Sequence, residues 1–139
     1  MIALDRFVGD LDEPRRAEKH RLLSLVATTF RRLHQEGIYH GDMKAVNLFL
    51  REDGDAVSMV LADYDRVEFD APVPPRRRIK NIAQLSASVP ICIGLADRLR
   101  FFREYTRGDE RVARQWKNWF QLIITDCRRK IVVRTEPIE

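Results

Sequence analysis

The sequence contains few glycines, few cysteines and no long apolar run. It has six glycines in 139 residues, and the absence of any G-x-G-x-x-G excludes the glycine-rich loop that often cradles nucleotide phosphates. No apolar run approaches the roughly 20 residues that span a bilayer. The N-terminal stretch MIALDRFVGDLDEP contains acidic residues early and has no long apolar segment, so we expect no signal peptide. Cys92 and Cys127 lack metal-type spacing, so we expect free thiols in a reducing cytoplasm.

Basic side chains are in slight excess. The chain carries 25 Lys and Arg, of which 20 are Arg, against 21 Asp and Glu, for a net charge of +4. Guanidinium groups suit phosphates and carboxylates, but here they are scattered among acids, so we expect no nucleic-acid partner. With 45% hydrophobic residues and no low-complexity tract or repeat, the chain reads as one globular domain with a modest core.

Apolar periodicity predicts helices on either side of a short β-hairpin. Residues 14–36 show one apolar stripe, and Gly37 suits the end of that helix. Apolar NLFL and AVSMVLAD flank the turn signal Asp53-Gly54, which indicates two antiparallel strands. Helical periods return at about 76–88, 95–106 and from about 109, where Asp109 can cap the helix. The predicted fold class is α+β and mostly α.

The stretch YHGDMKAVNLFL, residues 39–50, collects polar side chains just before the first strand of this hairpin. Because a hairpin returns the chain to its starting edge, Asp42 and Asn47 can converge with Asp63, which follows the second strand. Two carboxylates and an amide form an oxygen-rich site of the kind that Mg²⁺ prefers, together with phosphate oxygens.

These residues carry a resemblance to a known family. HGDMKAVN has the His-x-Asp-x4-Asn spacing of the kinase catalytic loop, and LADYD ends a strand in Asp where kinases have Asp-Phe-Gly. With RRRIKNIAQLSASV and DRLRFFREY, residues 1–107 resemble the bacterial lipopolysaccharide core kinases, which phosphorylate Kdo and heptose sugars. The resemblance implies the C-terminal lobe of a protein-kinase-like fold and ATP-dependent phosphoryl transfer to a sugar hydroxyl of the lipid A–core. It also implies a cytoplasmic protein, peripheral at the inner membrane.

The resemblance assigns roles to five residues of the motif. Asp42 would orient the sugar hydroxyl and accept its proton, and Lys44 would reach the transferring phosphoryl group. Asn47 and Asp63 would hold Mg²⁺ on the ATP phosphates, and His40 would support the loop by hydrogen bonding. Phosphoryl transfer needs such a set because its catalysis rests on positioning and charge neutralisation.

Three consecutive arginines open the helix that follows the Pro-rich loop. The resemblance places Arg76, Arg77 and Arg78 near the acceptor, where guanidinium forks can bind the carboxylates and phosphates of lipopolysaccharide. The competing interpretation is a solvated helix start, neutralised by Glu68 and Asp70.

The sequence also departs from the kinase pattern. It lacks the glycine-rich loop, and no strand carries the phosphate-pairing lysine of kinases. We therefore expect a hinge-like segment at 1–13, a kinase-like C-terminal lobe at 14–130 and a frayed tail at 131–139. The nucleotide lobe would have to come from elsewhere, for example from a partner chain.

Other interpretations remain open at the sequence level. Asp42 and Asn47 could make turns only, and Lys44 could be a surface residue. Trp116 and Trp119 fit a core better than a sugar-stacking platform. The chain could also be an atypical kinase for a protein or an aminoglycoside, or a non-catalytic pseudokinase that binds without turnover.

Overall fold

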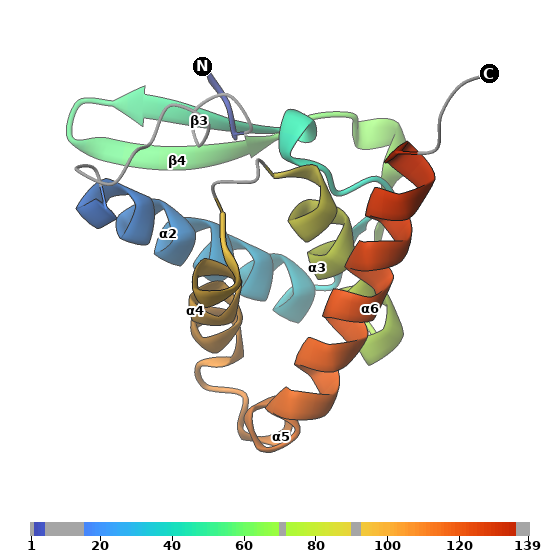
Figure 1. The fold of residues 1–139 in the computed structure, drawn as a ribbon. Coiled ribbons are helices and arrows are strands. Elements are labelled where there is room, and N and C mark those ends of the chain that lie inside the picture. Colours follow the sequence, from blue (N-terminus) through green and yellow to red (C-terminus); the bar gives the residue numbers. More distant parts are fainter. Residues whose placement is uncertain (1, 5–15, 70–71, 90–92, 136–139) are drawn as a thin grey trace.

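A computed structural model describes residues 2–4, 16–69, 72–89 and 93–135 of the chain. Helices make up most of this part, and a β-hairpin lies across one end of the helical layer (Figure 1). Helix α2 packs against α4, and α3 packs against α6. The helices are α2 (Arg16–Gln35), α3 (Pro75–Ser88), α4 (Leu95–Thr106), α5 (Glu110–Arg114) and α6 (Trp116–Thr135), with short 3-10 turns η2 (Ala45–Asn47) and η3 (Tyr64–Arg66).

Two small antiparallel sheets frame the loop that carries the motif. The first has the order β1-β3-β4, and the second pairs β2 with β5. Gly54 has a φ of 65° and is the first residue of the two-residue turn between β3 and β4, a position that glycine takes in a type II′ turn. The strands are β1 (Ile2–Ala3), β2 (Ile38–His40), β3 (Leu48–Asp53), β4 (Ala56–Leu61) and β5 (Val67–Phe69).

The core lies between the helices and the inner face of the hairpin. Phe30 of α2 is fully buried, Phe102 of α4 is 1% exposed, and Leu48 of β3 is 1% exposed. Phe30 meets Phe101 edge to face, and Phe102 stacks with Trp119 of α6. Burial of such large side chains, at roughly 1.5–3 kcal/mol each, fixes the hairpin on the helical layer.

The predicted helices and hairpin are present with shifted ends. The helix expected from 14 is described from Arg16, since 5–15 lie outside the described residues, as does most of the hinge-like segment 1–13. Asp109 caps α5 by accepting from the backbone N of Val112 at 3.2 Å, but the long helix expected from about 109 is interrupted at Gln115.

Three short strands were not predicted from the sequence, and α6 extends into the segment predicted to be a frayed tail. The pairs β1–β3 and β2–β5 involve segments of only two or three residues, which are too short to show a period. The tail expected to fray from 131 is instead helical as far as Thr135, and 136–139 lie outside the described residues.

Candidate functional site

His40 anchors the motif loop through both of its ring nitrogens. The backbone N–H of Asp42 donates to Nδ1 at 2.9 Å, and Nε2 bonds the carbonyl oxygen of Ala62 at the same distance. Because a carbonyl oxygen only accepts, Nε2 carries the proton and Nδ1 is the acceptor. His40 is fully buried, so its ring positions the loop from behind and is not placed to exchange protons with a substrate.

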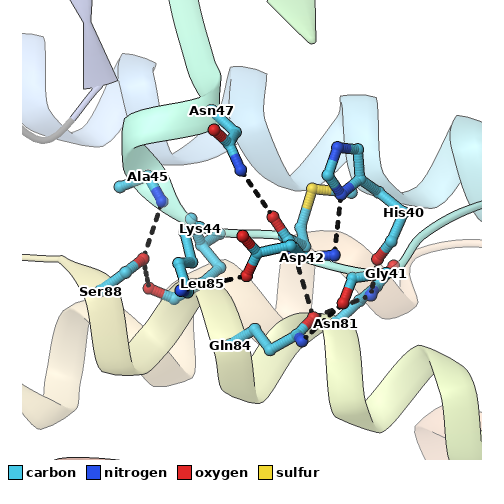
Figure 2. A network of polar contacts seen from close by, with 11 residues as sticks. His40, Gly41, Asp42, Lys44, Ala45, Asn47, Asn81, Gln84, Leu85 and Ser88 are labelled. Atoms are coloured by element: carbon cyan, nitrogen blue, oxygen red, sulfur yellow. Dashed lines mark hydrogen bonds and ion pairs between the residues drawn. The ribbon is translucent and has the colours of Figure 1, made fainter. Parts of the chain in front are cut away.

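Asn47 links the loop to the end of the hairpin. Its Nδ2 donates to the backbone oxygen of Asp42 at 2.9 Å, as Figure 2 shows. Its own backbone oxygen accepts from the N–H of Ala62 at 2.8 Å. The structure thus brings Asp42 and Asn47 into contact. Ala62, the residue before Asp63, is hydrogen-bonded to both Asn47 and His40.

Asp63 adopts a left-handed backbone conformation with a φ of 65°. This conformation is uncommon for residues other than glycine, although Asp adopts it more readily than most, and it clusters at functional sites. Asp63 is exposed, and no described residue bonds its carboxylate. The carboxylate is therefore available to a ligand at the edge where the hairpin strands end.

Lys44 faces the Asp42 carboxylate. Its Nζ lies 3.2 Å from Oδ1 of Asp42, and the two side chains are 40% and 28% exposed. A half-exposed pair of this kind contributes little stability. It does place an ammonium group beside the carboxylate expected to contact the substrate hydroxyl.

A polar face of α3 holds the loop from the other side (Figure 2). Asn81 donates to the backbone oxygen of His40 at 2.8 Å. Gln84 donates to the oxygen of Gly41 at 3.1 Å and accepts from the N–H of Met43 at 3.2 Å. Ser88 accepts from the N–H of Ala45 at 2.8 Å.

These three α3 residues were missed in the sequence analysis. The available signal was their spacing, because polar side chains at i, i+3 and i+7 share one helix face. Asn81 is fully buried, and a fully buried amide needs partners for each of its hydrogen-bonding groups. The backbone oxygen of His40, the side chain of Gln84 and the ring of His34 supply them.

The polar network continues from Asn81 into the interior. Its Oδ1 lies 3.1 Å from Nε2 of His34, whose Nδ1 lies 2.7 Å from the Tyr105 hydroxyl, and this hydroxyl accepts from Nε of Arg78 at 2.6 Å. Because Oδ1 of Asn81 can only accept, Nε2 of the neutral His34 ring donates to it, and Nδ1 of His34 accepts from the Tyr105 hydroxyl. Desolvation by burial lowers the pKa of His34 to about 4 and raises the pKa of Tyr105 to about 12.

The three arginines predicted to bind the acceptor substrate do not share one environment: Arg78 lies in the interior network, and Arg76 and Arg77 line a cleft. Arg78 belongs to the interior network, lies near Asp109 at 3.4 Å and sits over the rings of Tyr105 and Trp119. The guanidinium group of Arg78 is therefore engaged by interior partners. Arg76 and Arg77 line an open cleft beside Gly41, and Nη1 of Arg77 pairs with Glu68 at 2.6 Å.

The donor set fits Mg²⁺ bound together with phosphate. Because Nδ2 of Asn47 is used by the loop, its Oδ1 is free to ligate, and the Asp63 carboxylate is exposed. In the described part of the chain, no three His, Cys, Asp or Glu residues gather as a metal site. Mg²⁺ commonly takes one or two protein oxygens and completes its octahedron with phosphate and water, so a pair of ligands is sufficient.

The chain is similar in structure to a solved protein. In a solved structure described as WaaP in complex with acyl carrier protein, WaaP has a TM-score of 0.76 and 23% sequence identity to this chain, covering 93% of this chain and 57% of that one. The chain thus spans little more than half of that protein's length. A search of curated proteins found no match.

The sequence match identifies the family. The profile of the lipopolysaccharide kinase (Kdo/WaaP) family matches residues 1–105, and these residues contain the anchored loop, the hairpin and the supporting face of α3. The predicted kinase-like fold and the predicted family are both confirmed. The chain belongs to the lipopolysaccharide kinase (Kdo/WaaP) family.

Proposed function

We propose that this chain carries the phosphoryl-transfer site of an ATP-dependent kinase for a sugar hydroxyl of the lipopolysaccharide inner core. The observation that carries the proposal is the anchored loop. Its backbone is bonded from both sides while the carboxylate of Asp63 and the amide oxygen of Asn47 remain free of described partners. A preorganised set of charges of this kind is what phosphoryl transfer requires.

Each residue has a role in the proposed reaction. Asp42 orients the acceptor hydroxyl and accepts its proton. Lys44, 3.2 Å from Asp42, stabilises charge on the transferring group. Asn47 and Asp63 hold Mg²⁺, which when bound neutralises charge on the nucleotide phosphates.

The outer face of the hairpin offers a surface for the nucleobase. Phe49 pairs with Val60 across β3 and β4, and both are only half-buried. Strand alternation places these two side chains on the face opposite Leu48 and Leu50, which belong to the core. An aromatic ring next to Asn47 suits stacking with a base.

We further propose that tight ATP binding needs a nucleotide lobe beyond these 139 residues. The sequence has no glycine-rich loop and no strand lysine of the kinase type. The nucleotide phosphates would therefore be contacted only from the side of the motif loop and Asp63. The segment 1–13 would then serve as the hinge, and the assembled enzyme would work in the cytoplasm, peripheral at the inner membrane. In the described part of the chain, no helix is long and apolar enough to cross a membrane.

Nucleotide titration of the chain, with Mg²⁺ and with EDTA, tests the site. We expect weak binding that depends on Mg²⁺, and we expect Asp63→Asn to weaken it roughly tenfold, the size expected for one charged contact. The matched control is Asp55→Asn, which removes the same charge from an exposed position at the hairpin turn. Equal affinities with and without Mg²⁺, or equal effects of the two variants, would contradict the proposed role of Asp63.

A second candidate function is a binding module without turnover. The missing phosphate-gripping elements favour it, because losing one positioning element can cost orders of magnitude in rate. The two candidates differ in the behaviour of Asp42→Asn. In an enzyme this change abolishes transfer and leaves nucleotide affinity intact, whereas a binding module has no transfer to lose.

A further inference from the structure

The hydroxyl of Tyr105 is aimed from α4 at a histidine of α2. Tyr105 is fully buried, and its ring stacks with Phe102 and meets the ring of His34 edge to face. Its hydroxyl oxygen lies 2.7 Å from Nδ1 of His34 and accepts from Nε of Arg78 at 2.6 Å. Since Arg78 brings its own hydrogen to this bond, the single hydrogen of the hydroxyl is left for His34.

The direction of the hydrogen bonds is set at the other end, by the motif loop. The backbone oxygen of His40 can only accept, so Nδ2 of Asn81 faces it and donates at 2.8 Å (Figure 2). Oδ1 of Asn81 is thereby turned to His34 and accepts from Nε2 at 3.1 Å. With its proton on Nε2, the neutral ring of His34 needs a donor at Nδ1, and the Tyr105 hydroxyl is that donor. One directed series of hydrogen bonds therefore runs from α4 to the loop.

Both hydrogens of the Asn81 amide are used in this orientation. The second goes to Oε1 of Gln84 at 3.2 Å, and Gln84 bonds the backbone on either side of Asp42. Asn81 is fully buried. Turning its amide over would set its oxygen against the carbonyl oxygen of His40, which is unfavourable because two buried acceptors in contact have no donor between them. The orientation of this one amide thus decides how firmly the backbone around Asp42 is held.

A second hold on the loop comes from the residue before β5. The N–H of Gly41 donates to the backbone oxygen of Arg66 at 2.8 Å. A Cβ on Gly41 would lie 3.3 Å from that oxygen, so the two segments approach closely. Because the loop is held from two sides, loss of the hold from α3 should change the opening of the loop by the worth of about one hydrogen bond and leave the fold intact.

We propose that Tyr105 is a positioning residue for the motif loop, acting through His34 and Asn81. Its hydroxyl satisfies Nδ1 of His34 and so keeps the ring proton on the side of Asn81. Without the hydroxyl, Nδ1 becomes a buried acceptor with no donor, and the ring is more stable in another position or with its proton on Nδ1. Either change releases the Asn81 amide from its fixed orientation. The effect on phosphoryl transfer rests on the proposed function, whereas the effect on the loop does not.

Tyr105→Phe tests the hydroxyl alone, because it keeps the ring and removes one oxygen atom. In the native chain, the NMR shifts of the ring nitrogens of His34 should show Nε2 protonated and Nδ1 as a hydrogen-bond acceptor. In Tyr105→Phe we expect the Nδ1 shift to change. Amide hydrogen exchange at Asp42, measured relative to Phe30 in the core of α2, should become roughly tenfold faster, the factor that corresponds to about one hydrogen bond.

The matched control is Thr106→Val, which removes the neighbouring hydroxyl of α4. That hydroxyl donates to the backbone oxygen of Arg103 within the same helix. We therefore expect the His34 shifts to stay native and Asp42 exchange to change by less than about twofold. His34→Leu removes the intermediate partner. In that background Tyr105→Phe should speed Asp42 exchange no further, because partners in one hydrogen-bond network do not act additively.

Phosphate transfer to isolated lipopolysaccharide gives the functional readout. Under the proposed function Asp42 contacts the acceptor hydroxyl and Asp63 holds the metal. Tyr105→Phe should therefore slow transfer roughly tenfold and change Mg²⁺-dependent nucleotide affinity by less than about twofold. A general loss of structure would instead lower both.

Three outcomes overturn the proposal: native His34 shifts in Tyr105→Phe, equal effects of Tyr105→Phe and Thr106→Val on Asp42 exchange, or further acceleration by Tyr105→Phe in the His34→Leu background. The proposed function is judged separately. If the native chain transfers no phosphate while Tyr105→Phe loosens the loop, only the proposed function is rejected. If Tyr105→Phe transfers phosphate at the native rate and its loop is unchanged, only the role of Tyr105 is rejected.

Discussion

His34 and His40 are both buried, and each bonds through both ring nitrogens. His40 holds backbone atoms of the motif loop directly. His34 acts one step further away, through Asn81 on one side and Tyr105 on the other. Because Oδ1 of Asn81 can only accept, Nε2 of His34 carries the proton and Nδ1 of the neutral ring accepts from the Tyr105 hydroxyl. Protonation would place a second hydrogen against the Tyr105 hydroxyl.

This arrangement predicts a pH-dependent stability. The pKa of His34 is lowered to about 4 in the fold, whereas an unfolded His titrates near 6.5. The unfolded chain therefore binds more protons between these values, so the contribution of His34 is complete above pH 6.5 and is lost as the pH falls towards 4. Between pH 7 and pH 5 the free energy of unfolding should fall by roughly 2 kcal/mol through this residue.

Urea unfolding at the two pH values, followed by circular dichroism, measures the effect. In His34→Gln the difference between pH 7 and pH 5 should shrink by about that amount, although the variant is less stable at both. His20→Gln, a change in a half-buried histidine elsewhere on α2, should leave the difference unchanged. An identical pH dependence in His34→Gln and the native chain would show that His34 does not titrate as inferred.

At the scale of elements, α3 is the scaffold of the site. Gln84 bonds Gly41, Met43 and Asn81, so Gln84→Ala leaves the backbone N–H of fully buried Met43 without a partner. The cost of such an orphaned group is about 1–3 kcal/mol. We expect Gln84→Ala to lower the free energy of unfolding by that amount and to speed amide hydrogen exchange at Met43.

Lys80→Ala, an exposed change on the same helix, is the control and should alter neither quantity at the loop. Exchange at Met43 that is equally slow in Gln84→Ala would mean that α3 does not fix the loop backbone.

The elements also show what the sequence could predict. The helical periods and the Asp-Gly turn signal located α2, α3, α4 and the hairpin, because each buries one regular stripe or face. The motif spacing predicted that Asp42 and Asn47 lie close together, because η2 and β3 follow the loop directly. Strands of two or three residues carry no period, and the direction of a side chain such as Arg78 depends on tertiary partners, Tyr105 and Asp109, far away in the sequence.

At the scale of the whole molecule, the chain presents a supported loop, and under the proposed function it would contact a nucleotide from one side only. The outer face of the hairpin carries the half-buried side chains of Phe49 and Val60. Kinases turn over at about 1–100 per second. We expect the chain alone to remain below about 1 per second with ATP, Mg²⁺ and an inner-core acceptor.

Transfer of labelled phosphate to isolated lipopolysaccharide measures this rate, with Asp42→Asn as the blank. Adding a nucleotide lobe in cis or in trans should raise the rate. A rate in the normal kinase range for the unassisted chain would contradict the proposed need for a second lobe.

The close approach of Gly41 to Arg66 has a consequence for control in the cell. Protein kinases often carry an arginine at the position of Gly41, where it can pair with a phosphorylated residue of a nearby loop. Here Gly41 stands at that position and its N–H donates to the backbone oxygen of Arg66 at 2.8 Å, and residues 66–78 contain no Ser, Thr or Tyr that could be phosphorylated. We therefore expect that no phosphorylation within residues 66–78 controls the proposed activity, which would instead follow the supply of the protein and of its acceptor.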